Sequence, residues 1–367
     1  MFMEEKLLHL CKIFQIEGEY LGFNEVGDGH INSTYYVRFS NAGEEQGYIV
    51  QRINTYVFKD PVGVMQNGSS VTEFIRQKIE SSGGNADRAV LKYCQKSNGD
   101  YYHVFDDGSF WRACRYIKDS VGVLRAEDEY IIKESGRAFG EFQKYLFDYP
   151  VSELNIVIPH FHNTILRYSA FREAIENDLA DRKRLASEEI AGFFALEEVA
   201  CEPYKMQKRG EIPLRVTHND TKTSNVLFDK TTRERLCVID LDTVMPGLVA
   251  FDFGDAIRIG ANKADEDEKD LLKVGLDLGK YEAFTQGFLE ELGAFITDNE
   301  KRALPLGAIA MTVECGIRFL ADYLNGDKYF RIHYPEQNLV RARCQLALAR
   351  DMLKNFDVMQ EIVKKYS

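Results

Sequence analysis

The alternation of hydrophobic and polar residues divides the chain into an early part rich in short strands and a later part rich in helices. Between residues 23 and 114, stretches with the two-residue period of a half-buried strand are separated by Gly, Asn and Asp. The predicted strands are Tyr35–Phe39, Tyr48–Ile53, Tyr101–Phe105 and Phe110–Cys114. Between the second and the third, Val71–Ile79 repeats its apolar residues at helical spacing. The early part is therefore predicted to be a small antiparallel sheet with one helix.

From about residue 126 onward, the apolar residues recur at the spacing of long amphipathic helices. The predicted helices are Ile131–Leu146, Leu166–Ile175, Ala186–Val199, Leu271–Leu292 and Ala308–Leu324. A strand-rich island interrupts them, with predicted strands at Leu214–Thr217, Asn225–Phe228 and Leu236–Ile239. We therefore expect an α+β fold with two lobes: an N-terminal β lobe (1–115), a hinge (116–122) and a larger, mainly helical C-terminal lobe (123–367).

The composition narrows the class of partner. With 46 Lys+Arg against 58 Asp+Glu, the 367 residues carry a formal net charge of −12. No basic cluster is present, so nucleic acid and anionic membranes are excluded as partners and a small molecule is expected. The 7 cysteines are scattered and never spaced C-x-x-C, which favours reduced thiols. With no apolar run of spanning length and no basic leader, we expect a cytoplasmic protein, and a monomer is compatible with the sequence.

One polar segment in the strand-rich island has the residue types that phosphoryl transfer requires. Asp220 follows a predicted strand, Asn225 begins the next strand, and Asp240 ends the strand after that. A carboxylate near an attacking hydroxyl orients it, and carboxylate and amide oxygens hold Mg²⁺ against the phosphates of ATP. The spacing predicts Asp220 as a catalytic residue, with Asn225 and Asp240 as Mg²⁺ ligands. The alternative is that these are ordinary loop and capping residues.

The motifs around these residues resemble those of a known family. The densest similarity is to the N-acetylhexosamine 1-kinases, within the superfamily of aminoglycoside phosphotransferases and choline kinases. The matching stretches are His218–Lys222, Val238–Gly247 and Asp252–Ala256, with weaker similarity at Gly27–Asn32, Gln51–Asn54 and Arg318–Tyr323. The resemblance implies a bilobal fold like that of protein kinases. It also implies transfer of the γ-phosphate of ATP to the anomeric C1 hydroxyl of N-acetylglucosamine or N-acetylgalactosamine.

Three further residues of the island have competing interpretations. Asp252-Phe253-Gly254 spells the magnesium triplet of protein kinases, but no apolar strand leads into it. The resemblance implies instead that Asp252 is a buried carboxylate that accepts backbone N–H bonds from the catalytic loop. Lys222 is predicted to be catalytic by offsetting charge on the transferring phosphate, or else to be a solvated loop lysine. Asp242 is either a second metal ligand or a group that supports the ligands.

The predicted nucleotide-binding residues lie in the first lobe and the hinge. Gly27 and Gly29 would let backbone N–H groups approach the triphosphate, although many hairpins contain the same G-x-G pattern. Arg52 stands where kinases place a phosphate-binding lysine, and strand alternation puts Val50 on the same face, where it would cover the adenine. Glu73 either orients Arg52 or is an exposed glutamate. The adenine edge is expected to meet the backbone of Arg115, Tyr116 and Ile117.

The resemblance points to three residues for the sugar: His30, Arg318 and Tyr329. A neutral polyol needs several hydrogen bonds from groups that would otherwise be unpaired. Each residue has an ordinary alternative, namely a loop position for His30, an i,i+4 ion pair with Glu314 for Arg318, and a core position for Tyr329. His160 and His162 have no Cys or carboxylate partners at metal-ligand spacing, so we interpret both as structural.

The sequence thus predicts a kinase that uses ATP and Mg²⁺ to phosphorylate a small sugar. Asp220 would also contact the sugar hydroxyl. The same fold is compatible with another acceptor, such as choline, homoserine, methylthioribose or an aminoglycoside. The third possibility is a catalytically silent nucleotide-binding module, which would be expected to lack Asp220, Asn225 or Asp240.

Overall fold

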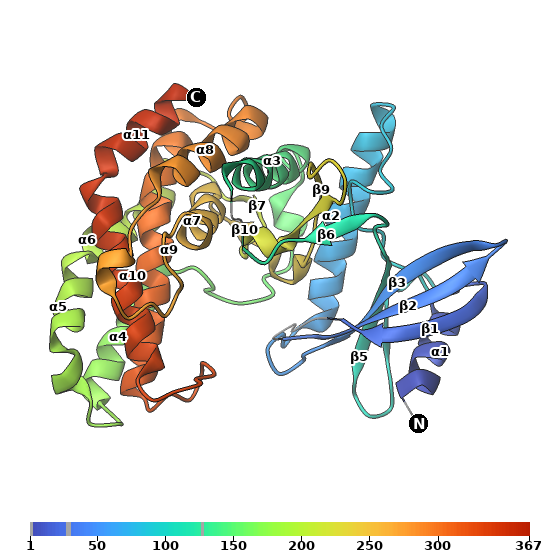
Figure 1. The fold of residues 1–367 in the computed structure, drawn as a ribbon, viewed down its shortest axis with the longest axis horizontal. Helices are drawn as coiled ribbons and strands as arrows, with labels where there is room; N and C mark the ends of the chain where they lie inside the picture. Colours follow the sequence, from blue (N-terminus) through green and yellow to red (C-terminus); the bar gives the residue numbers. More distant parts are fainter. Residues whose placement is uncertain (1–2, 27–30, 126–127) are drawn as a thin grey trace. The chain divides into compact units, whose positions relative to one another are not determined.

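The structure is a computed structural model that describes residues 3–26, 31–125 and 128–367 (Figure 1). The chain divides into two compact units, and each unit is assembled from separate parts of the sequence. The first unit comprises Met1–Gly122, Asp148–Pro159 and Val226–Met245, and the second comprises Val123–Phe147, His160–Asn225 and Pro246–Ser367. The α+β fold class is confirmed, because the first unit is built on an antiparallel sheet and the second is mainly helical. The functional lobes 1–115, 116–122 and 123–367 stay a prediction.

The main sheet of the first unit has five antiparallel strands in the order β1-β2-β3-β5-β4 (Figure 1). The strands are β1 (Glu19–Glu25), β2 (Ser33–Asn41), β3 (Glu44–Ile53), β4 (Tyr102–Val104) and β5 (Phe110–Arg115). The predicted strands 35–39, 48–53 and 110–114 lie within β2, β3 and β5, and the strand predicted over 101–105 is shorter at both ends, as β4. In β2 every second residue is buried, as expected for a strand with one covered face.

Helix α1 (Met3–Ile13), which the sequence analysis did not predict, covers one face of this sheet. Its apolar stripe packs against every second residue of the three central strands. The buried cluster comprises Leu7, Leu10, Cys11, Phe14, Ile16, Tyr35, Val37, Phe39, Tyr48, Val50, Trp111 and Ala113. We call this side of the sheet the α1 face. The side chains of alternate residues lie on the opposite face.

Helix α2 (Pro61–Ser81) contains the predicted helical segment and begins ten residues before it. Pro61 stands at the first helical position, and the carboxylate of Asp60 accepts a hydrogen bond from the Gly63 amide at 2.9 Å. The first unit also holds a small antiparallel sheet in the order β6-β8-β9. Its strands are β6 (Ser120–Gly122), β8 (Val226–Asp229) and β9 (Arg235–Val238).

The second unit is dominated by helices. These are α3 (Glu129–Tyr145), α4 (Thr164–Asn177), α5 (Ser187–Ala195), α6 (Glu197–Lys208), α7 (Val249–Gly260), α8 (Leu278–Leu292), α9 (Asp298–Leu324), α10 (Gln337–Lys354) and α11 (Phe356–Lys365). A two-stranded sheet of β7 (Arg215–Thr217) and β10 (Met245–Gly247) accompanies them. Three of the five predicted helices are confirmed, in α3, α4 and α9.

The other two predicted helices need correction. The single helix expected over Ala186–Val199 is two helices, because α5 ends at Ala195 and α6 starts at Glu197. The helix expected from Leu271 begins only at Leu278. Its start is set by Asp277, whose carboxylate accepts a hydrogen bond from the Lys280 amide at 3.1 Å and so caps the first turn.

Helix α9 is the only helix in the described part of the chain that is long and apolar enough to cross a membrane. Its most apolar window has a mean hydropathy of 1.4 and is 83% buried among the other helices. An all-round apolar helix with this burial is typical of the core of a large domain.

Two glycines allow α7 and α9 to cross at close range. A Cβ atom at Gly254 would clash with the carbonyl oxygen of Gly307, and a Cβ atom at Gly307 would clash with the carbonyl oxygen of Ala250. Backbone atoms cannot move aside as a flexible side chain can. Close packing of this crossing therefore requires glycine at both positions, which assigns Gly254 of the Asp-Phe-Gly triplet a structural task.

We expect Gly254→Ala to lower the free energy of unfolding by about 1–3 kcal/mol, because the added methyl group overpacks a backbone contact. Gly260→Ala, at the end of the same helix, is the matched control. There the new Cβ would meet only the end of the Ile132 side chain, at 3.1 Å, and alanine favours the helix. Urea unfolding of both variants measures the difference. Equal stabilities would contradict the assigned role of Gly254.

Candidate functional site

The loop after β7 carries the predicted catalytic residues, and a buried histidine anchors it. His218 is fully buried, and its ring lies 5.5 Å from that of Phe139 and 6.0 Å from that of Phe142. Its Nδ1 accepts a hydrogen bond from the Asp220 amide at 3.2 Å. Asn219 between them has a left-handed backbone, with φ of 64°. The loop therefore turns sharply around the imidazole and directs Asp220 away from the core.

Asp252 holds the same loop from beneath. One carboxylate oxygen accepts the His218 amide at 2.8 Å, the other accepts the Asn219 amide at 2.7 Å, and Gln143 Nε2 donates at 2.6 Å. Burial raises the pKa of Asp252, although the hydrogen bonds that its carboxylate accepts act in the opposite direction. The structural role implied for Asp252 is confirmed. Both of its oxygens are already used to fix the loop.

We expect Asp252→Asn to lower the free energy of unfolding by about 1–3 kcal/mol, because an amide can accept from only one of the two backbone N–H groups. Thermal unfolding and limited proteolysis of the loop measure the effect. Thr285→Val, which removes another fully buried polar group of this unit, controls for a general response to core substitution. A variant that folds normally but selectively loses Mg²⁺ affinity would contradict the structural role.

Asp220, Lys222 and Asn225 come together in this loop. Lys222 Nζ lies 2.9 Å from Asp220 Oδ2, and Asn225 Nδ2 donates to the same oxygen at 3.0 Å. Asn225 Nδ2 also donates to the Asp220 carbonyl at 2.9 Å. The side chains of Asp220 and Lys222 retain 31% and 38% exposure, so both are accessible to a substrate. Oδ2 of Asp220 is thus held by two donors, and the catalytic role of Asp220 stays a prediction.

The residues predicted to hold Mg²⁺ have the right donor chemistry. Because the Asn225 amide nitrogen is turned toward Asp220, its oxygen faces the other way. Asp240 follows β9 and is exposed, with a left-handed backbone at φ of 61°. Amide and carboxylate oxygens suit a hard cation such as Mg²⁺. Asn225 belongs to the second unit and Asp240 to the first. Their roles as ligands stay a prediction.

The first unit contains a buried ion pair. Its acid, Asp242, comes two residues after Asp240 in the sequence. Arg112 of β5 donates through Nη1 to the Asp242 carboxylate, and the side chains of the pair are only 4% and 2% exposed. Asn32 Nδ2 donates to the other oxygen of Asp242 at 2.7 Å. Arg112 Nε donates to Gln51 Oε1 at 2.9 Å. These bonds tie the segment after Asp240 to the sheet, and they give Asp242 a supporting role.

The sequence analysis assigned no role to Arg112. The signal was present, because an arginine between tryptophan and alanine in a predicted strand is rarely buried without a carboxylate partner.

The structure places Val50 and Arg52 on the α1 face of the sheet. Val50 is fully buried in the cluster beneath α1, and its contact with adenine stays a prediction. Arg52 shares this face, and its charge partly offsets the burial that raises the pKa of Tyr35. Gln51, by contrast, points to the opposite face, where it meets Arg112. The geometry therefore favours the opposite face as the polar one.

The other residues considered for the nucleotide site belong to the glycine segment, to the hinge and to α2. Gly27 and Gly29, together with His30, which was predicted to bind the sugar, lie outside the described residues. At the hinge, the Arg115 amide donates to the Lys92 carbonyl and the Tyr116 amide to the Gly47 carbonyl, both at 2.9 Å, and Ile117 is buried. Glu73 is exposed and accepts a hydrogen bond from Gln77 at 3.0 Å, which favours its interpretation as a surface glutamate.

The predicted sugar residues of the second unit lie beside each other. The Arg318 guanidinium is 5.8 Å from the ring centre of Tyr329, which is 74% exposed and therefore not a core residue. Glu314, one turn before Arg318, is instead 2.9 Å from His162 Nδ1, and His162 Nε2 is 3.4 Å from the Asn219 carbonyl. His162 thus bridges α9 to the catalytic loop, in agreement with its structural interpretation.

Most of the chain is similar in sequence to a known family of enzymes. A sequence model of the phosphotransferase enzyme family matches residues 22–284, which is more than half of the chain.

Solved structures agree in fold. An aminoglycoside phosphotransferase from Alicyclobacillus acidocaldarius is 11% identical, with a TM-score of 0.60 over 93% of this chain and 92% of that one. A choline kinase from Cryptosporidium parvum is 13% identical, with a TM-score of 0.57 over 98% and 97%. A spectinomycin phosphotransferase solved with ADP and spectinomycin is 14% identical, with a TM-score of 0.52 over 99% and 98%.

Proposed function

The chain belongs to the phosphotransferase enzyme family, and we propose that it transfers the γ-phosphate of ATP to the C1 hydroxyl of an N-acetylhexosamine. The family is one of small-molecule kinases, and the similar spectinomycin phosphotransferase was solved with ADP. The observation that carries the proposal is the Asp220 carboxylate, held at 2.9 Å by Lys222 and at 3.0 Å by Asn225 on a loop that Asp252 fixes.

In the proposed reaction, Asp220 Oδ1 accepts a hydrogen bond from the C1 hydroxyl and aligns its oxygen with the γ-phosphorus. A new bond forms from this oxygen to phosphorus while the bond to the β–γ bridging oxygen breaks. The hydroxyl proton passes to Asp220, and ADP leaves with the bond's electron pair. An anomeric hydroxyl is more acidic than an ordinary alcohol, which makes the proton transfer easier. Lys222 offsets negative charge on the transferring group.

Asn225 and Asp240 are the residues proposed to bind Mg²⁺. When bound, the ion offsets charge on the phosphate oxygens of the nucleotide. Two other residues act independently of the ion. Asp252 fixes the backbone of the loop, and Lys222 orients Asp220, with its Nζ 2.9 Å from Asp220 Oδ2.

A neutral sugar suits the charge of the proposed acceptor residues better than a cationic substrate. Arg318 places a guanidinium 5.8 Å from the exposed ring of Tyr329 and 5.3 Å from the ring of Phe330. A quaternary ammonium such as choline is recognised by aromatic faces free of a competing cation. Here an arginine already occupies those faces, and its donors can bond hydroxyl and amide oxygens of a sugar.

The test is ADP formation with a panel of acceptors: N-acetylglucosamine, N-acetylgalactosamine, glucose, choline and kanamycin. Phosphorus NMR of the product identifies the phosphorylated position. We expect the two N-acetylhexosamines to be preferred and the phosphate to be on C1. The Asp220→Asn variant, purified in parallel, measures contaminating kinases. Phosphate on C6, or turnover only with choline or kanamycin, would contradict the proposed acceptor. No turnover with any of the five would also contradict the proposed acceptor.

A further inference from the structure

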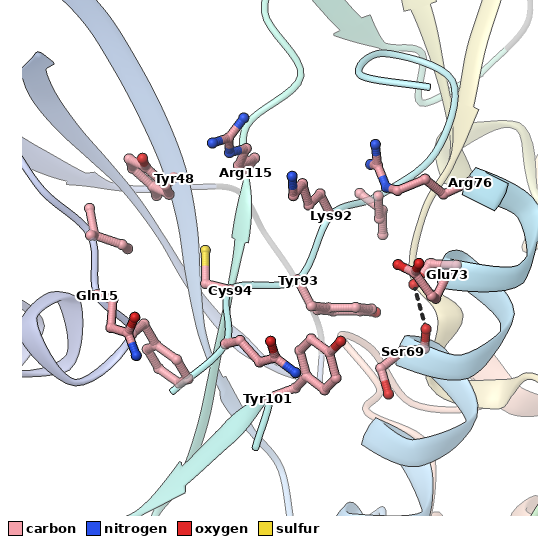
Figure 2. A pocket seen from close by; sticks show the side chains of 15 residues that line it. Gln15, Tyr48, Ser69, Glu73, Arg76, Lys92, Tyr93, Cys94, Tyr101 and Arg115 are labelled. Carbon is pink, nitrogen blue, oxygen red and sulfur yellow. Dashed lines mark hydrogen bonds between the residues drawn. The ribbon is translucent and has the colours of Figure 1, made fainter. Parts of the chain in front are cut away.

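A cavity of about 310 Å³ lies within the first unit (Figure 2). It is bounded by the end of α1, by the middle of α2, by the segment 91–95 and by residues of β3 and β5. The residues that β3 and β5 contribute are Tyr48 and Arg115, which lie on the α1 face of the sheet. Gln51 and Arg112 point to the opposite face. The cavity is therefore bordered by the sheet face opposite to the one that carries Gln51 and Arg112.

The charge of the lining residues is opposite to that of the whole protein. Arg76, Lys92 and Arg115 line the cavity together with a single acid, Glu73, in a chain whose formal net charge is −12. In Figure 2 the charged ends of the three basic side chains lie along the same side of the cavity. Such local concentration of positive charge favours a small anion over a neutral or cationic ligand.

Arg76 provides independent support for an anionic ligand. The residue is only 8% exposed, and within the described part of the chain its Nη2 has no hydrogen-bond partner. Its Nη1 forms two long ion pairs with exposed carboxylates, at 3.5 Å from Glu80 and 3.8 Å from Asp87. A buried guanidinium nitrogen without a partner is energetically costly. An anionic ligand that turned the Arg76 guanidinium toward the cavity would supply the missing acceptor.

The rest of the lining suits a ligand that carries hydroxyl groups. Hydroxyl and amide side chains surround the space, and aromatic rings cover part of it. These residues are Gln15, Ser69, Thr72, Gln95, Tyr93 and Tyr101. The volume lies at the lower end of the roughly 300–1,000 Å³ typical of ligand pockets, which suits a metabolite with one ring.

We propose that this cavity binds a small organic phosphate of the hexose monophosphate class. The phosphate group would contact Arg76 and Lys92, and the hydroxyl groups would bond the polar side chains opposite. Because the ligand contacts α2 and the start of the hinge at Arg115, it would stabilise the first unit. This inference does not depend on the activity proposed above, since binding is measured without ATP or turnover.

The experiment is isothermal titration calorimetry of the full chain with glucose 6-phosphate, glucose and inorganic phosphate. We expect glucose 6-phosphate to bind at least tenfold more tightly than inorganic phosphate, glucose to give no heat at millimolar concentration, and Kd to rise with salt. Lys92→Gln, at an exposed position, should raise Kd at least tenfold without affecting folding. Lys12→Gln, an exposed lysine that does not line the cavity, is the matched control and should leave Kd unchanged.

Arg76→Met tests the buried contact. Glucose 6-phosphate should raise the Tm of the unsubstituted protein but not that of this variant. The proposal is overturned if Lys92→Gln and Lys12→Gln bind with the same Kd, if neutral glucose binds as tightly as its phosphate, or if no ligand binds. Equal affinity for inorganic phosphate would also overturn the hexose monophosphate class.

Discussion

Replacement of Asp220 by asparagine is expected to lower kcat by a factor of about 10²–10⁴ while the KM values for sugar and ATP change little. Asparagine keeps the size of the side chain and its ability to accept from Lys222, which lies 2.9 Å away, but it cannot take up the hydroxyl proton. The loss should therefore fall on the chemical step. Steady-state rates measured with N-acetylglucosamine and then ATP as the varied substrate give kcat and both KM values.

Two controls separate this effect from damage to the loop. Asp106→Asn removes a carboxylate from a surface turn and should leave kcat unchanged. The Tm of Asp220→Asn should match that of the unsubstituted protein, because Asp220 is partly exposed and its backbone bonds to His218 and Asn225 remain. A kcat within a factor of about ten of the unsubstituted enzyme would contradict the role of Asp220 as base.

Replacement of Arg112 by methionine is expected to lower the free energy of unfolding by about 3–5 kcal/mol. The change leaves the Asp242 carboxylate, which is 2% exposed, without its charged partner in the interior of the first unit. Asp242→Leu should lower the free energy of unfolding by a similar amount, because it leaves the buried guanidinium without its carboxylate. The double variant should recover much of the loss, since two apolar side chains leave no unpaired charge. Urea unfolding of all four proteins gives the coupling free energy.

The exposed pair Arg125–Asp265 is the matched control, with side chains 54% and 72% exposed. Arg125→Met should cost less than about 1 kcal/mol because water screens the pair and solvates the charge that remains. If Arg112→Met were no more destabilising than Arg125→Met, the buried pair would have no special role. Loss of activity in Arg112→Met at temperatures where it stays folded would further indicate that the pair positions the segment after Asp240.

The grouping of Asp220, Lys222 and Asn225 in one loop could be predicted from the sequence because the residues lie close together along the chain, while their roles in catalysis stay a prediction. The spacing of Asp220, Lys222 and Asn225 is short enough for the local backbone to bring the side chains together, and the structure does so. Strong periodicity likewise predicted the sheet and the helices α3, α4 and α9. Capping residues such as Asp277 decided the boundaries, and their effect was not considered in the sequence analysis.

Which face of the sheet Arg52 lies on could not be predicted from the sequence. Strand alternation correctly predicted that Val50 and Arg52 share a face, but alternation cannot say which face is covered. That depended on α1, a helix far from β3 in sequence, which buries Val50 completely. The partner of Arg112 was equally out of reach of local patterns. Asp242 lies 130 residues further along the chain, so only the tertiary fold joins them.

The distance along the chain between Arg112 and Asp242 affects how the first unit forms during translation. The first unit contains Val226–Met245, so a nascent chain that has reached Gly122 still lacks strands β8 and β9 and the counterion of Arg112. At about 5–20 residues per second, the ribosome needs on the order of 10 s to add the 130 residues that separate Arg112 from Asp242. During that interval the guanidinium must stay hydrated. The first unit can therefore close only after most of the chain has been translated, and a fragment ending at Gly122 should be a poor autonomous domain.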